Sequence, residues 1–449
     1  MSSEVAPAPA DNPPAPPSPL DVLRSRQYLV LLVVAAVLGV PISAVAYGFL
    51  ALVGAIQRWA FTTAPQELFG GVPLWWPLVP LAGAGTVVGV VIRYVPGHGG
   101  ESPADGFHAG GYPGPTEMLG IAAAAIASIG LGVVVGPEAP LIAIGGGLAV
   151  LAVRLARRGT VPTNVASVVA ATGSFAAVST LFGSPLAGAF LMMEASGLGG
   201  ATATAVLMPG LLGSGIGSLV FLGLDSWTGL GTFSLVVRGL PTVGPPTVAG
   251  FAWAVLIGAL AALLCWAIRW AALHLRPLVV RHILLLTPVV AVAIAALAIG
   301  YAAATGHGVG DVLSSGQDAL GPLLLGQAGY GVGALLLLVV CKGLAYAGAL
   351  AGFRGGPTFP AMFIGAAGGT ALAHLPGLDA LPGAAIGLGA MTAGMLRLPL
   401  TSVLLATLFL GADGLTVMPL VILGVVVSYV VTLRLPDPGP RVAPAPEAA

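Results

Sequence analysis

Charged residues are scarce in this sequence. Of its 449 residues only 7% are Asp, Glu, Lys or Arg, whereas 57% are hydrophobic, and the mean hydropathy is +1.01. Such a chain has too little polar surface to cover a water-soluble globule of this size. Sixteen basic residues balance sixteen acidic ones, so no net charge attracts nucleic acid. The composition therefore excludes a soluble globular protein and predicts one that lies in the lipid bilayer.

Cysteine is nearly absent as well. Cys265 and Cys341 both lie in apolar runs, in different parts of the chain, so they provide neither a disulfide framework nor the spacing of a metal site. We expect both to be packing residues, and we expect no metal and no cofactor. A signal peptide is not expected, because no basic segment opens the chain and the first apolar run is too long.

Long charge-free apolar stretches are abundant. A membrane-spanning helix needs about 20 mostly apolar residues. The stretches that approach or exceed this length are 27–56, 118–136, 201–224, 248–267, 282–304 and 415–433. Others contain Gly and Pro where a continuous helix would be interrupted, namely 132–153, 173–193, 355–375 and 383–411. The pattern predicts an all-α, multi-pass protein of a cell membrane, with many tilted and broken transmembrane helices.

The two ends of the chain differ in composition from its middle. Residues 1–26 are rich in Pro and small residues and predict a disordered tail, and residues 435–449 predict a second one. The region 27–434 is expected to be a single membrane transport domain. Arginines precede the first span and follow the last, which predicts that both termini are cytoplasmic.

Three landmarks that contain Gly or Pro occur twice, in the same order and at nearly the same separation. The pairs are Gly97-His98-Gly99 with Gly306-His307-Gly308, Gly136-Pro137-Glu138-Ala139-Pro140 with Gly356-Pro357-Thr358-Phe359-Pro360, and Ser184-Pro185-Leu186 with Leu398-Pro399-Leu400. Duplicated membrane segments with interrupted helices are typical of transport proteins whose site lies where the broken helices meet. The sequence therefore predicts two inverted-repeat halves, about 27–224 and 248–434.

The Gly-Pro landmarks predict helix N-termini. Proline is tolerated in the first helical turn, where its missing N–H would be unpaired in any case, and the preceding glycine lets the backbone turn. A helix N-terminus held inside the membrane presents free N–H groups and the positive end of the helix dipole, which favours an anion. A cation site would instead need several carboxylates, and the candidates within the spans are few: Glu117, Glu138 and Glu194. We therefore expect the transported species to be a small anion.

The motifs resemble those of the CLC family of chloride channels and proton/chloride antiporters, over roughly residues 27–434. The segment around Glu138 is similar to the family's Gly-Lys/Arg-Glu-Gly-Pro motif, with Pro137 in the basic position and Ala139 in place of glycine. The segment from Gly356 is similar to Gly-x-Phe-x-Pro, with the aromatic residue one place later, at Phe359. A third segment, Gly97-His98-Gly99-Gly100-Glu101, is compared with Gly-Ser-Gly-Ile-Pro and puts His98 in the position of the serine.

The resemblance implies that Glu138 is a gate, whose carboxylate occupies an anion position and moves aside when it is protonated or displaced. An ionisable group at membrane depth costs about 2.5–3.5 kcal/mol on insertion scales, which also favours a functional role over simple helix capping. The resemblance further implies a homodimer with one pore in each subunit. The anion-binding residues expected from the three motifs are His98, Gly99, Gly136, Pro137, Ala139, Gly356, Pro357, Thr358 and Phe359.

Two departures from the family pattern bear on proton coupling. In the antiporters of the family a second glutamate follows a pair like Met193-Glu194, and here that position is Ala195. The tyrosine that the family places after the last span is missing too. Both departures favour a chloride channel gated by Glu138. The alternative is a proton/chloride antiporter that would use Glu194 or Glu117 for the proton, and fluoride stays open as an alternative anion.

Two other classes of function fit parts of the pattern. A secondary transporter of a neutral solute would also have duplicated halves and a buried glutamate, but it needs more polar groups within its spans than this chain has. An intramembrane enzyme needs a nucleophile with its base, or a metal cluster, at membrane depth. The histidines His98, His108 and His307 have no ligand spacing with carboxylates on a common helix face, so we expect no enzyme.

Overall fold

The computed structural model describes residues 23–107, 111–158, 162–197, 200–229, 236–237 and 239–439. Most of the two expected tails therefore lies outside the described residues. Within these ranges the regular elements are helices, apart from one isolated β-bridge. The elements are α2 (Arg26–Arg58), η1 (Trp59–Thr63), α3 (Ala64–Phe69), α4 (Leu78–Tyr94), η2 (Pro103–Asp105), α5 (Pro115–Gly130), α6 (Glu138–Arg157), α7 (Thr163–Phe182), α8 (Pro185–Ser196), α9 (Gly200–Thr228), α10 (Val248–Arg281), α11 (Ile283–Thr305), η3 (Val309–Asp311), α12 (Gln317–Leu324), α13 (Val332–Gly352), α14 (Thr358–Leu372), α15 (Ala380–Leu396), α16 (Pro399–Phe409), η4 (Gly411–Asp413) and α17 (Gly414–Arg434).

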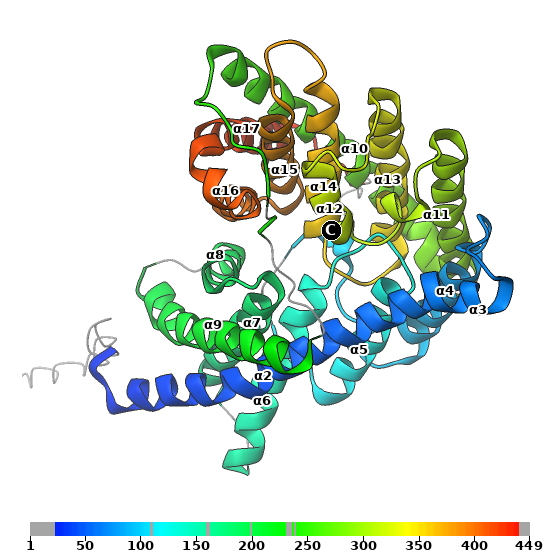
Figure 1. Cartoon of the computed structure of the whole chain (residues 1–449). Helices are drawn as coiled ribbons and strands as arrows, with labels where there is room; N and C mark the ends of the chain where they lie inside the picture. Colours follow the sequence, from blue (N-terminus) through cyan, green and yellow to red (C-terminus); the bar gives the residue numbers. More distant parts are fainter. Residues whose placement is uncertain are drawn as a thin grey trace, which may run out of the picture.

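Eight of the described helices are long and apolar enough to cross a membrane, and five shorter apolar helices accompany them. The all-α, multi-pass architecture expected from the apolar stretches is thereby confirmed. The interruptions fall where Gly and Pro predict them, with breaks at Gly183-Ser184 and at Arg397-Leu398. In Figure 1 the helices up to α9, coloured blue to green, fill the lower part of the view, and α10 to α17 lie mostly above them.

Two of the expected spans have other boundaries. The span predicted at 118–136 ends as a helix at Gly130, because Gly132 adopts a left-handed φ of 89° and the chain then leads into the isolated bridge. The span predicted at 248–267 continues as α10 to Arg281, a helix of 34 residues. Composition marks the apolar core of a span, whereas local backbone conformation decides where the helix ends.

The two halves repeat a local packing pattern at equivalent places. Helix α6 contacts α7 where Gly145 faces the carbonyl of Gly173, and α14 contacts α15 where Gly365 faces that of Gly387. A Cβ atom at these glycines would collide with the facing backbone. Small residues that let helix backbones approach closely are typical of membrane helix interfaces. The same close crossing therefore fixes the direction of α6 and of α14, the helices that begin at the two Gly-Pro landmarks.

Candidate anion site

The two Gly-Pro landmarks, one from each half, meet in the structure. Gly136 and Gly356 form the isolated antiparallel bridge, in which each N–H donates to the other's carbonyl, at 2.7 Å and 2.6 Å. Helix α6 begins at Glu138 and α14 at Thr358, two residues beyond the bridge on each side. The predicted pair of helix N-termini therefore lies together at the junction of the halves.

Glu138 is fully buried and reaches across this junction. Its Oε1 accepts a hydrogen bond from the backbone N–H of Thr358, the first residue of α14. Glu138 thus caps the helix of the other half, whereas the capping alternative from the sequence placed it on its own helix, α6. Within the part of the chain that the structure describes, neither Oε2 of Glu138 nor the buried Oγ1 of Thr358 has a hydrogen-bond partner.

The bridging glycines make room for this carboxylate. Neither Gly136 nor Gly356 has a positive φ, so backbone conformation does not require glycine at either position. A Cβ atom on either residue would overlap the carboxyl group of Glu138. The absence of a side chain at both positions creates a space in which a negatively charged group fits between two helix N-termini.

The remaining residues of the second Gly-Pro landmark are held by buried aromatic side chains. The carbonyl of Pro357 accepts a hydrogen bond of 2.8 Å from the hydroxyl of Tyr346, which is fully buried on α13. The ring of Phe359 packs on that of Phe182, with 5.8 Å between the centroids. Tyr346 was not among the expected site residues, although a phenol within an apolar helix needs a hydrogen-bond partner and so signals a polar contact.

The landmark Gly97-His98-Gly99, which contains no proline, does not begin a helix. Four successive residues, from Gly97 to Gly100, have left-handed φ values between 50° and 95°, and such a run forms turns instead of a helix. The exposed imidazole of His98 lies 3.0 Å from the carbonyl of Ile92, so this geometry does not bring it to the carboxylate of Glu138. Gly99 is buried, and its role, like that of His98, stays a prediction.

Arg354 places a positive charge immediately before the bridge. Its Nε donates to the carbonyl of His98 at 3.3 Å, and thereby connects the first landmark to the segment of Gly356. Burial lowers the pKa of Arg354 to about 10, nearby Arg276 lowers it as well, and Asp105 raises it. The guanidinium is therefore still protonated at neutral pH, and it lies against the carbonyls of His98 and Phe353. The sequence motifs gave no signal for this residue.

The two other glutamates considered for proton transfer are engaged at helix N-termini. Glu194, on α8, accepts hydrogen bonds from the N–H groups of Leu400 and Thr401, at 3.0 Å and 2.7 Å, and from the Thr401 hydroxyl at 2.7 Å. Glu117 accepts one from the N–H of Gly114, the residue before α5, at 2.8 Å. Both carboxylates therefore stabilise helix N-termini, Glu194 that of α16 and Glu117 that of its own α5.

Replacing Glu194 with alanine is expected to destabilise the protein and to leave chloride transport in place. The free N–H groups at the start of α16 would lose their acceptor, which costs about 1–2 kcal/mol. Thermal unfolding in detergent measures this loss, with Glu101→Ala, in an exposed loop, as the matched control. If Glu194→Ala kept its stability and lost a coupled proton movement instead, Glu194 would be a proton carrier.

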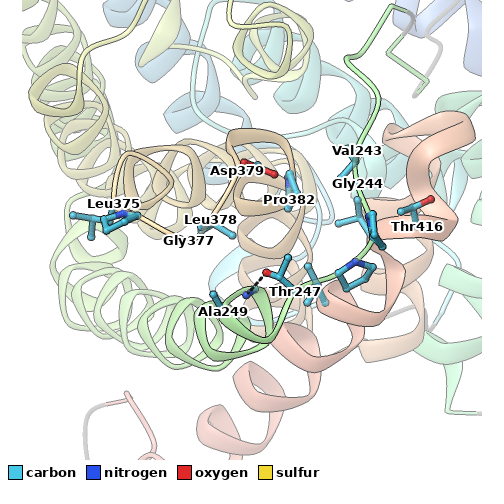
Figure 2. Close-up of a pocket in the computed structure, with 16 residues that line it drawn as sticks. Val243, Gly244, Thr247, Ala249, Leu375, Gly377, Leu378, Asp379, Pro382 and Thr416 are labelled. Carbon is cyan, nitrogen blue, oxygen red and sulfur yellow. Dashed lines mark hydrogen bonds between the residues drawn. The ribbon is translucent and has the colours of Figure 1, made fainter.

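A surface hollow lies apart from these residues. Figure 2 shows it between the start of α10, the loop around Gly377 and the first residues of α17. Its lining contains none of the landmark residues, and its one charged side chain is Asp379. An acidic lining disfavours anions, so this hollow is not the candidate site.

Comparisons with known proteins agree with the geometry. The sequence pattern of the family described as voltage gated chloride channel matches residues 84–433. The chain is 29% identical to "Putative ion-transport protein YfeO" of Salmonella choleraesuis over 364 residues, which are 80% of this chain and 84% of that protein. The protein of the same name from Escherichia coli is 26% identical over 365 residues, 80% of this chain and 82% of that one.

Solved structures share the fold. A slow cyanobacterial Cl⁻/H⁺ antiporter superposes with a TM-score of 0.71 at 18% identity, over 90% of this chain and 94% of the other. A CLC-type fluoride/proton antiporter superposes with a TM-score of 0.63, also at 18% identity, over 90% and 95% of the two chains. The resemblance inferred from the motifs is confirmed, and the chain belongs to the voltage-gated chloride channel family.

Proposed function

We propose that this protein is a chloride channel of a cell membrane whose gate is Glu138. One observation carries the proposal: the buried carboxylate of Glu138 accepts a hydrogen bond from the first N–H of α14, in the other half of the molecule. A carboxylate at a helix N-terminus stands where a free anion would bind. Protonation or outward rotation of this side chain would leave the N–H of Thr358 to a chloride ion.

The proposed anion ligands are the groups around this carboxylate. They include the backbone of the two bridging segments and the hydroxyl of Thr358, which is buried and has no hydrogen-bond partner among the described residues. Gly99 and His98 belong to the proposal only as predictions from the sequence. The full set is His98, Gly99, Gly136, Pro137, Ala139, Gly356, Pro357, Thr358 and Phe359.

A channel is favoured over a proton/chloride antiporter because the two glutamates considered for the proton are engaged elsewhere. Glu194 and Glu117 both stabilise helix N-termini, and Ala195 stands where the antiporters of the family carry a glutamate. The solved structures named above are antiporters, one for chloride and one for fluoride, so proton-coupled exchange is the second candidate function. A transporter of a neutral solute is a more remote alternative.

The distribution of arginine supports an orientation with both termini in the cytoplasm. Arginines occur at the start of α2 and at the ends of α4, α6, α10 and α17, and the ends of α4 and α10 meet at a hollow lined by Arg93 and Arg281. Arg154 of α6 packs on the ring of Tyr112, which precedes α5, and Arg276 of α10 pairs with Asp105 of η2. Membrane proteins have an excess of Lys and Arg on the cytoplasmic side.

A homodimer with one pore in each subunit completes the proposal.

Purified protein in liposomes with an outward chloride gradient tests the proposal, with chloride efflux and internal pH recorded together. We expect chloride to leave when another ion can balance the charge, with no proton movement against its own gradient. Uphill proton movement driven by chloride would replace the channel with the antiporter. Liposomes that release no chloride and no fluoride would contradict anion transport altogether.

A further inference from the structure

Lys342 is the only lysine of the chain and lies halfway along the membrane-spanning helix α13. It is fully buried, 0% exposed. A charged residue at such a depth is costly and needs a defined partner, so it points to a function by default. Neither the proposed gate nor the anion ligands involve it.

Four consecutive carbonyl groups surround the ammonium group. Nζ of Lys342 donates to the carbonyl oxygens of Asp311, Val312, Leu313 and Ser314, at 2.9, 3.0, 3.1 and 3.2 Å. The short helix η3 ends at Asp311, so these are carbonyls that no further helical turn satisfies. Ser314 has a left-handed φ of 55°, at the end of this carbonyl series. The ammonium has three donors for four acceptors, and no carboxylate of the described residues lies within ion-pair distance of it.

The loop of these carbonyls contacts the segment before one Gly-Pro landmark and, through its next residues, the helix after the other. The N–H of Ser314 donates to the carbonyl of Gly132 at 2.9 Å, and from Gly132 the chain runs directly to the bridging residue Gly136. On the other side, the ring of Phe363 lies 4.8 Å from Nζ of Lys342 and also faces Gly316. Phe363 belongs to α14, the helix that begins at the second Gly-Pro landmark. The lysine therefore connects the approach to one landmark with the helix that begins at the other.

We propose that the carbonyl groups of residues 311–314 form a cation site and that the ammonium group of Lys342 occupies it. The occupied site holds the two Gly-Pro landmarks in position. The effect on anion flux rests on the proposed function, whereas the cation site itself does not. Oxygen atoms about 3 Å from the charge suit an ammonium group, so a lysine-free variant should bind a small alkylammonium ion. Lys342 is thus a positioning residue and does not touch the anion.

The test uses full-length Lys342→Ala in two salts of equal chloride concentration, sodium chloride and methylammonium chloride. In sodium chloride we expect the midpoint of thermal unfolding to fall by about 5 °C. Chloride flux should fall about tenfold, because a displacement of the anion ligands by about 1 Å can reduce activity that much. Methylammonium should restore both quantities, and tetramethylammonium, which has no N–H donor and is larger, should restore neither.

Leu338→Ala is the matched control, because it empties buried space on the same helix without removing a charge. We expect methylammonium to have no effect on it. Equal effects of methylammonium on both variants, or no effect on Lys342→Ala, would overturn the proposal. If the wild type carries no anion, the proposed function fails, and the thermal midpoints still decide whether the cation site exists.

A second variant keeps the proposal testable if Lys342→Ala folds poorly. In Lys342→Met, which keeps the length of the side chain, hydrogen exchange should increase together in peptides 309–316 and 131–136. An increase limited to α13 would overturn the positioning role. Failure of both variants to fold would make Lys342 a requirement of the whole fold and would also overturn a local role.

Discussion

Chloride flux through Glu138→Gln is expected to continue and to lose its dependence on pH. Glutamine has nearly the same size as glutamate, but it cannot be protonated and it carries no charge to compete with chloride at the N-terminus of α14. Wild-type flux should change about tenfold between about pH 4.5 and pH 7.5, where a carboxyl group can titrate, whereas the variant should change less than about twofold. Efflux from liposomes at a series of pH values measures the difference.

The control for this experiment is Glu194→Gln, which alters a carboxylate on α8 that the structure engages at the start of α16. This variant should keep the pH dependence of the wild type. Unchanged pH dependence in Glu138→Gln would reduce Glu138 to a structural cap of α14. Complete loss of flux in a folded Glu138→Gln protein would also contradict the gate, since an uncharged side chain should leave the position to an anion.

Gly356→Ala is expected to reduce chloride flux by about tenfold or more and to destabilise the protein by about 1–3 kcal/mol, as overpacking does. The added methyl group would occupy the space of the Glu138 carboxyl group. Because the backbone conformation at Gly356 is open to alanine, the cost should come from this overlap. Adding Glu138→Ala should therefore recover the lost stability, which thermal unfolding of the single and double variants measures.

Gly368→Ala provides the comparison on the same helix. A Cβ atom there would make an ordinary contact, 3.9 Å from the side chain of Val339, so flux and stability should stay close to those of the wild type. Equal losses in Gly356→Ala and Gly368→Ala would mean that α14 tolerates no added methyl group. In that case the space around Glu138 would have no special importance.

The sequence predicts the parts of this site that depend on local chemistry. Gly and Pro act within one or two residues of their own position, so the starts of α6 and α14 at the two Gly-Pro landmarks could be predicted. The segment 97–99 contains no proline, and its successive positive φ values form a turn and no helix start. The apolar composition of 118–136 was wrong about where that helix ends, which the conformation of Gly132 decides.

Contacts between distant segments could not be predicted from the sequence. The hydrogen bond from Thr358 to Glu138 joins residues 220 positions apart, and that from Thr401 to Glu194 joins residues 207 apart. A single chain contains no local pattern for such pairs. The isolated lysine at position 342 was visible in the sequence, but the loop of carbonyls that surrounds it could only be found once the fold was known.

The bridge between Gly136 and Gly356 also bears on the kind of motion that transport can use. Rocking the two halves apart at the site would break both of its backbone hydrogen bonds away from water, where unpaired backbone groups are costly. Rotation of the Glu138 side chain leaves both of these bonds in place and breaks only its own hydrogen bond from the N–H of Thr358, which a chloride ion can then accept. The proposed gate at Glu138 therefore suits a nearly rigid frame, in which one carboxylate moves and the two halves stay together.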